Sequence, residues 1–105
     1  MSEYSEDIAK YTSSVDDAAV AGIVKHLGIA LRKQDSSLVS CTDPTELGRV
    51  RDSWLKKKLA LTNPDDELEA AIAAVCGTMK ADRTKHRVTF YYLLAEQYGK
   101  LGDLH

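Results

Sequence analysis

The sequence lacks the features that mark several classes of protein. None of its apolar runs approaches the ~20 residues needed to cross a bilayer. Its first seven residues are acidic, whereas a secretory signal is basic and then apolar. Because 14 basic and 16 acidic residues give a net charge of −2, the chain has no general attraction for nucleic acid or an anionic membrane. We therefore expect a cytoplasmic protein that does not bind a membrane.

Cysteine and histidine are also scarce. Cys41 and Cys76 lie far apart in the sequence, with no Cys-x-x-Cys motif and no paired histidine. We expect two buried or half-buried thiols and no disulfide. The alternative is a Cys2His2 zinc site completed by His26 and His86, although zinc ligands normally come in close pairs. The chain has no glycine-rich phosphate loop, nucleophile elbow or paired-histidine motif, so we predict no enzyme activity and no catalytic, cofactor-binding or metal site.

What the sequence does contain is apolar residues at helical spacing. With 105 residues, 44% of them apolar, the chain can bury a core without metal or disulfide staples. Strict alternation of apolar and polar residues is absent, so the pattern predicts an all-α fold, a single small domain over residues 1–105. The predicted helices, about five, span 3–11, 13–32, 44–61, 64–80 and 84–98, and residues 100–105 are predicted to fray.

Two of the helix starts are strongly marked. Asp43-Pro44-Thr45-Glu46 combines a capping carboxylate with a proline at the first helical position, and Asn63-Pro64-Asp65-Asp66 repeats the arrangement. The end of the second helix is less clear, because Gly28 is suited to close a helix. The apolar stripe that begins at Val20 continues through Gly28 to Leu31, which favours one continuous helix to about Arg32.

The helix predicted at 84–98 is apolar around nearly its whole circumference. Only Lys85, Thr89 and Glu96 form a narrow polar edge, and three tyrosines add to the apolar surface. A helix of this kind lies at the centre of its domain or in an oligomer interface. We expect it to be the central helix, and we expect its excess apolar surface to support self-association.

Charge is segregated into two basic blocks. The first block lies in the predicted third helix and comprises Arg49, Arg51, Lys56, Lys57 and Lys58. We interpret it as a solvated helix face, and the alternative is a contact for an acidic partner. The second block precedes and begins the last helix. There Arg83, Lys85, His86 and Arg87 lie beside the free amides of a helix start, which predicts a contact for an anion or for a carboxylate of a partner. The alternatives are a solvated helix start and a helix-turn-helix that binds nucleic acid.

Three stretches give the chain a family resemblance: Asp35-Ser36-Ser37-Leu38-Val39-Ser40, the run of Asp43-Pro44, Glu46-Leu47 and Lys57-Lys58-Leu59, and Thr89-Phe90-Tyr91-Tyr92-Leu93-Leu94. In these stretches the chain resembles a family of short bacterial proteins classified only as a domain of unknown function. The resemblance covers nearly the whole length and implies a bacterial, cytoplasmic, stand-alone helical domain. It implies no activity, substrate or site residue.

Three functional hypotheses follow from the sequence. The leading one is a non-enzymatic interaction protein that associates with itself or with another protein. The second is nucleic-acid or small-anion binding through the second basic block, which the acidic total charge disfavours for nucleic acid. The third is a small enzyme or ligand-binding protein that uses the same region.

Overall fold

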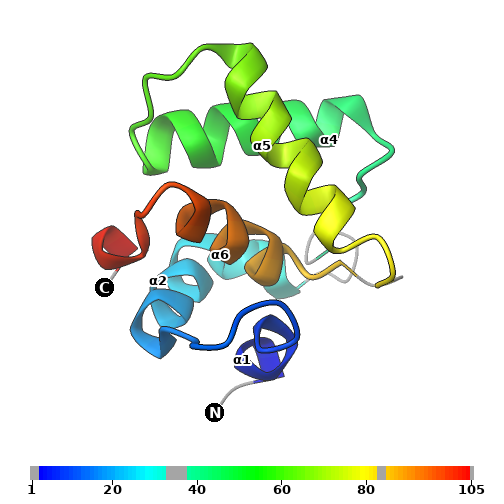
Figure 1. Ribbon diagram of the computed structural model, residues 1–105. Coiled ribbons are helices and arrows are strands. Elements are labelled where there is room, and N and C mark those ends of the chain that lie inside the picture. The colour runs from blue at the N-terminus through cyan, green and yellow to red at the C-terminus, as the bar shows by residue number, and fades with distance from the viewer. Residues whose placement is uncertain (1–2, 33–37, 83–84, 105) are drawn as a thin grey trace.

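The structure consists of helices joined by short connections. The computed structural model describes residues 3–32, 38–82 and 85–104. Its α-helices are α1 (Glu3–Ile8), α2 (Asp17–Leu27), α4 (Pro44–Arg49), α5 (Asp65–Thr78) and α6 (Arg87–Gln97) (Figure 1). A π-helix, η2 (Val50–Lys58), continues α4, and the 3-10 turns η1 (Gly28–Arg32) and η3 (Leu101–Leu104) follow α2 and α6. Across these ranges there is no strand, which confirms the all-helical prediction, and none of the helices is both long and apolar enough to span a membrane.

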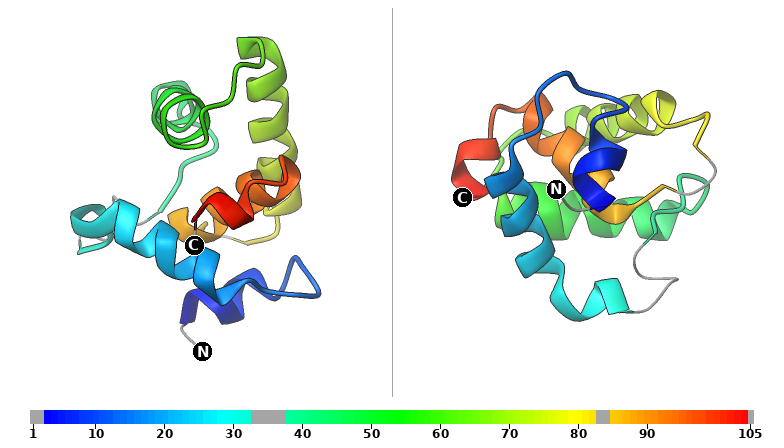
Figure 2. Two further views of the ribbon diagram at one scale, coloured as in Figure 1. Left: turned by 90° about the vertical axis from the view of Figure 1, so that its left-hand side faces the viewer. Right: turned by 90° about the horizontal axis from the view of Figure 1, so that it is seen from below.

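The last long helix, α6, is the centre of the fold. Figures 1 and 2 show it between the pair formed by α4 and α5 and the pair formed by α1 and α2. Every residue from Arg87 to Ala95 is buried. α6 contacts α1, α2, α5 and η3, and it meets η2 through Trp54, whose Nε1 donates to the Tyr91 carbonyl at 3.1 Å. The prediction of a central last helix is therefore confirmed.

Carboxylates cap two of the helices, and only the second does so where the sequence predicts, because α2 begins at Asp17 and not at the predicted residue 13. Asp16 accepts from the amide of Ala19 at the start of α2, and Asp43 accepts from the amides of Thr45 and Glu46 at the start of α4. The second proline motif behaves differently. Here α5 begins at Asp65 without a side-chain cap, and Asn63 donates from Nδ2 to Glu67 at 3.2 Å.

The second helix is shorter than predicted, because Gly28 ends it. Gly28 has φ of 44°, a conformation that residues with a Cβ rarely adopt, and its amide donates to the Val24 carbonyl. The chain then continues as the 3-10 turn η1 and brings Leu31 against the core from there. The prediction of one continuous helix to Arg32 is wrong, because an apolar stripe can persist when the helix type changes.

The third helix changes its hydrogen bonding midway. From Val50 the turns widen, and the Leu59 amide donates to the carbonyl of Trp54, five residues earlier, at 2.9 Å. The wide turns direct both Trp54 and Leu55 into the core, although a regular helix would place them on neighbouring stripes. The helix ends at Lys58, before the predicted Leu61, and Ala60 has a left-handed φ of 54°.

The end of the chain is folded, contrary to the predicted fraying of residues 100–105. η3 packs against α2, and Leu104 is only 4% exposed. A Cβ built on Gly22 of α2 would lie 1.8 Å from the Leu104 carbonyl oxygen, so only glycine permits this close approach. His105 lies outside the part of the chain that the structure describes.

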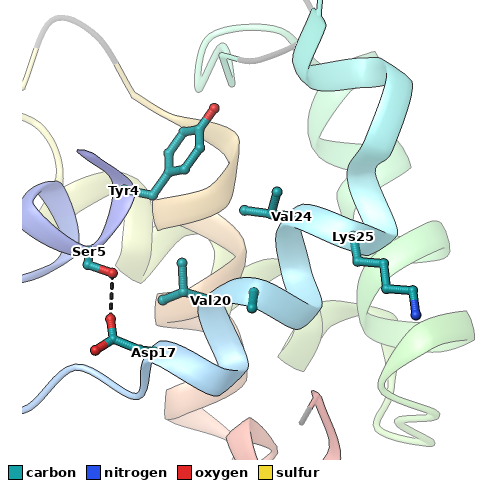
Figure 3. Close-up of a pocket in the computed structure, with 7 residues that line it drawn as sticks. Tyr4, Ser5, Asp17, Val20, Val24 and Lys25 are labelled. Carbon is teal, nitrogen blue, oxygen red and sulfur yellow. Dashed lines mark hydrogen bonds between the residues drawn. The ribbon is translucent and has the colours of Figure 1, made fainter. Parts of the chain in front are cut away.

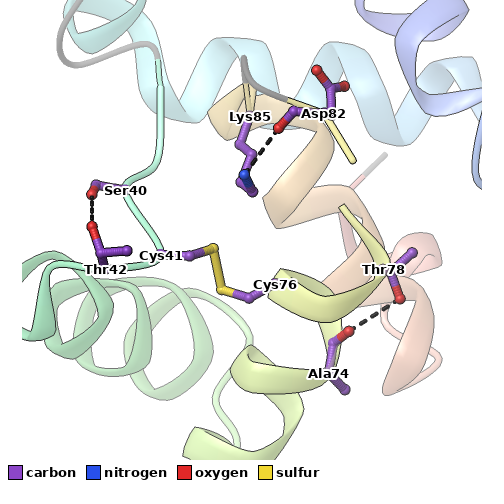
Figure 4. The surroundings of a disulfide bond; sticks show 8 residues. All are labelled: Ser40, Cys41, Thr42, Ala74, Cys76, Thr78, Asp82 and Lys85. Carbon is purple, nitrogen blue, oxygen red and sulfur yellow. Dashed lines mark hydrogen bonds between the residues drawn. A yellow bond between two sulfur atoms is a disulfide. The ribbon is translucent and has the colours of Figure 1, made fainter. Parts of the chain in front are cut away.

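Cys41 and Cys76 form a disulfide, with their Cα atoms 6.0 Å apart (Figure 4). The bond joins the segment before α4 to the last turns of α5. The prediction of two separate thiols is therefore wrong, and so is the zinc alternative, since both sulfurs are bonded to each other. The sequence separation of 35 residues concealed the pairing, because proximity here arises from helix packing.

Candidate functional site

The predicted anion contact at the start of α6 is not assembled as one exposed patch. Arg83 lies outside the described residues. The Lys85 ammonium donates to the backbone carbonyl of Asp82 at 2.9 Å (Figure 4). The His86 ring lies edge-on to the ring of Tyr4, with centroids 5.9 Å apart. Lys85 and His86 are half-buried and serve local contacts within the fold.

Arg87 points into the protein. It is 8% exposed, and its guanidinium forms an ion pair with Glu46 of α4. The same group donates to the Leu38 carbonyl at 3.1 Å and to the Tyr91 hydroxyl at 3.3 Å. We expected Arg87 to attract anions from solvent; instead it joins α6 to α4 and to the segment before it. Anion binding by Lys85 and His86 stays a prediction without Arg87 as a contributor.

α6 also starts later than predicted, at Arg87 instead of Thr84. Residues 85 and 86 are extended, and the Val39 amide donates to the Lys85 carbonyl at 2.8 Å. The carboxylate of Asp82, shortly before α6, accepts from the Tyr11 hydroxyl at 3.0 Å. Burial, together with the Asp82 carboxylate, raises the pKa of Tyr11 to about 12, so this phenol stays protonated and joins the α1 end to the α5 end.

Two residues of the first basic block, Arg51 and Lys56, are paired with acidic residues of α5. Arg51 donates to Glu69 at 2.8 Å, and Lys56 lies 2.6 Å from Asp65. The hydrogen bond that Lys56 donates to Asp65 raises the pKa of Lys56 above its usual value. These pairs join η2 to α5 across the surface, so the charges segregated along the sequence meet in space.

The described residues form a groove between α1 and α2, with a volume of about 640 Å³ (Figure 3). Its floor is apolar and comes mainly from Val20, Ala21 and Val24 of α2, while Tyr4 of α1 forms one wall. Ala21 is exposed and Val24 is half-buried, so apolar surface is open to solvent here. Exposed apolar surface of this kind favours contact with an apolar surface of another molecule.

Charged side chains mark the two ends of this groove. Asp17 lies at the start of α2, and its Oδ1 accepts from the Ser5 hydroxyl at 2.6 Å, which fixes α1 beside α2. Lys25 lies two turns further along the helix and is exposed. Asp17, Ala21 and Lys25 follow one another at intervals of four residues and so share one side of α2.

A second cavity, of about 250 Å³, lies between α4 and α5. Leu47 and Ile72 contribute apolar surface to it. The ion pair between Arg51 and Glu69 spans its edge and connects the two sides. This cavity is a cleft within a tightly joined pair of helices, and the α1–α2 groove is the better candidate for a contact surface.

Sequence reasoning missed the groove, although one signal was present. Val20 and Val24 belong to the apolar stripe of the second helix, and we assigned that stripe to the core. The available signal was on a neighbouring line of the same helix, where Asp17, Ala21 and Lys25 follow one another at intervals of four residues. Its meaning depends on α1, whose position against α2 cannot be inferred from the stripe alone.

Comparison with known proteins supports the family resemblance. A search of curated proteins finds no match for the chain. A model of the family described as "Protein of unknown function (DUF2853)" matches residues 3–102, which is nearly all of the sequence. The chain therefore belongs to the DUF2853 family.

Proposed function

We propose that this protein is a non-enzymatic interaction protein that associates with a second copy of itself through the groove between α1 and α2. The observation that supports this is the apolar floor of the groove, where Ala21 is exposed and Val24 is half-buried, with opposite charges at its two ends. A surface that carries both an acid and a base can complement an identical surface when the two copies are related by a two-fold axis.

The proposed contact surface lies on α2 and not on the last helix, α6. We expected the apolar excess of α6 to supply the interface, but the rest of the chain covers α6 on all sides from Arg87 to Ala95. The groove is where apolar side chains meet solvent instead. Self-association is retained as the proposed function, and its structural basis is α2.

The test is the mass of the protein in solution. We expect sedimentation velocity to show a shift from 11.6 kDa toward twice that mass as the chain concentration rises. A range from about 5 to about 500 µM covers the affinities expected of a small interface. Substituting Ala21→Glu introduces a charge into the apolar floor and is expected to keep the protein monomeric.

The matched control is Ala70→Glu, which adds the same charge to an exposed alanine of α5 away from the groove. This variant is expected to associate as the wild type does. A wild-type protein that stays at 11.6 kDa throughout the range would overturn the proposal. So would association that Ala21→Glu and Ala70→Glu affect equally.

The proposal includes a cytoplasmic location. A net charge of −2 gives the chain no general attraction for an anionic membrane surface, which supports this assignment. The disulfide weighs against it, because disulfides persist mainly in oxidising compartments. Fractionation of cells that express the full chain tests the location, and recovery outside the cytoplasmic fraction would contradict it.

A further inference from the structure

We infer that the two copies pack their α2 helices antiparallel about a two-fold axis at Ala21, so that Asp17 of each copy pairs with Lys25 of the other. This inference rests on the proposed self-association and specifies how the copies meet. It follows from three properties of α2: the positions of its charges, the size of the residue between them and the hydrogen bonding of Asp17.

The charges are placed symmetrically about Ala21. Asp17 and Lys25 each lie four residues from Ala21 on the same side of α2, and the two charges are about 12 Å apart along the helix axis. A two-fold axis at Ala21 that reverses the helix direction superimposes position 17 on position 25 of the other copy. Each copy then receives one acid–base pair from the other, which gives two equivalent pairs for one interface.

A parallel arrangement about a two-fold axis gives the opposite result. It would place Asp17 beside the same carboxylate of the second copy and Lys25 beside the same ammonium. Like charges placed opposite each other cost free energy, and opposite charges favour encounter and fix the register. The charge pattern of the groove therefore selects the antiparallel orientation.

The middle of α2 permits two helices to approach closely. Ala21 is exposed and has no side chain beyond Cβ, and the half-buried Val24 adds apolar surface beside it. Small residues at a crossing point allow a short distance between helix axes. An alanine at the axis then contacts the same alanine of the second copy, while Val24 of each copy covers the contact from water.

The two charged groups are free to take part in such pairs. Asp17 uses Oδ1 for the Ser5 hydroxyl, and a carboxylate has a second oxygen that accepts hydrogen bonds. Within the described parts of the chain, Lys25 has no ion-pair partner. Figure 3 shows the Lys25 side chain at the opposite end of the groove from Asp17.

Charge reversal tests the inference through the behaviour of mixtures. Lys25→Glu and Asp17→Lys each place like charges together in their own homodimer, and each is expected to weaken association about tenfold or more. In an equimolar mixture, the unchanged Asp17 of one variant meets the unchanged Lys25 of the other, and the two substituted side chains carry opposite charges and also meet. Association is therefore expected to return to within about threefold of wild type. Sedimentation velocity measures all three samples, with circular dichroism to confirm helix content.

A second measurement covers the case in which Asp17→Lys fails to fold, since this residue also holds Ser5 and favours the helix start. The wild-type dissociation constant is then measured between about 50 and 500 mM salt, together with that of Lys25→Glu. Salt is expected to weaken the wild-type dimer and to strengthen the Lys25→Glu dimer, because screening removes attraction in one and repulsion in the other. Lys57→Glu, on an exposed part of η2, is the control and is expected to behave as wild type.

The outcomes separate the two proposals. A wild type that stays monomeric overturns the self-association itself. A wild type that dimerises, with variants that fail to restore association when mixed, overturns only the antiparallel register. Preferential pairing of Lys25→Glu with wild type would indicate the parallel arrangement and would also overturn it.

Discussion

Arg87 and Glu46 form an ion pair that is largely hidden from water. Their side chains are 10% and 15% exposed, whereas the Arg51 and Glu69 side chains, which form a comparable pair on the surface, are 23% and 58% exposed. Removing one partner of a buried pair leaves a desolvated charge, and the cost is larger than at the surface. Arg87 also donates to the Leu38 carbonyl, so its loss would remove one of the contacts that hold the segment before α4.

We predict that Glu46→Ala lowers the free energy of unfolding by about 2–4 kcal/mol, because it leaves the Arg87 guanidinium buried without its carboxylate. Glu69→Ala is the matched control and is expected to cost less than about 1 kcal/mol. Urea denaturation measures both values. Equal losses for the two variants would show that burial does not decide the strength of these pairs.

His26 gives the protein a pH-dependent contribution to stability. Its ring lies 5.3 Å from the ring of Trp54, and although the residue is exposed at the surface, partial desolvation, with a smaller contribution from the charge of Lys58, lowers the pKa of His26 below 6.5. The unfolded chain therefore binds a proton more readily at this position than the folded chain. The stability that this difference provides is present above pH 6.5 and is lost as the pH falls toward the folded-state pKa.

We predict that the wild type loses stability between about pH 7 and pH 5, and that His26→Gln loses less over the same interval, because it removes the histidine proton. Trp54 is the only tryptophan, so its fluorescence reports unfolding in urea at each pH. If the wild type and His26→Gln lost the same stability over this pH interval, titratable groups other than His26 would account for the pH dependence.

Individual residues were predictable where their partners are close in the sequence. Asp43 and the amides it caps lie within three residues of one another, so the helix start could be identified from the sequence. Arg87 and Glu46 belong to different helices, and nothing in the local sequence of Arg87 indicates that it turns inward. For this reason the sequence did not indicate that Arg87 pairs with Glu46, and the anion contact stays a prediction.

The disulfide acts between elements. It fixes the segment before α4 to the C-terminal half of α5 and closes a loop across a sequence separation of 35 residues. Closing a loop of this size removes conformational freedom from the unfolded chain, which is worth about 3–4 kcal/mol in the chain-entropy model. The folded positions of η2, which continues α4, and of α5 are also held by Lys56–Asp65 and Arg51–Glu69.

We predict that Cys41→Ser with Cys76→Ser lowers the free energy of unfolding by about 3–4 kcal/mol and leaves the helix content unchanged. Urea denaturation followed by circular dichroism measures the loss. The wild type in reductant is expected to match the double variant, whose own midpoint does not respond to reductant. A wild-type midpoint that reductant leaves unchanged, with both thiols titratable, would contradict the prediction.

The order and approximate positions of the helices could be predicted from apolar spacing, but several of their ends and changes of helix type could not. The Gly28 end of α2 depends on whether the glycine adopts a positive φ, and a continuous apolar stripe is compatible with both outcomes. The wide turns of η2 likewise depend on the core, which accommodates Trp54 and Leu55 together. Tertiary packing decides where such helices end, and the spacing of apolar residues alone carries no information about that packing.

At the scale of the molecule, the central position of α6 was evident from its composition, since a helix without a polar face has to be enclosed. The surface left open by that enclosure was not evident. Which side of α2 faces solvent depends on how α1, α6 and η3 share the remaining sides. A candidate interface is what the packing leaves uncovered, so it becomes visible only after the helices are assembled.

The place of α6 in the chain has a consequence for synthesis. The helix that the others pack against follows α1, α2, α4 and α5 in the sequence, so it is made after all four of them. While the ribosome is still translating the first 86 residues, these helices have apolar faces and no central helix to cover them. The nascent chain therefore completes its core only after residues 87–97 have emerged, and folding of this protein is expected to finish after translation of most of the chain, not to proceed helix by helix during it.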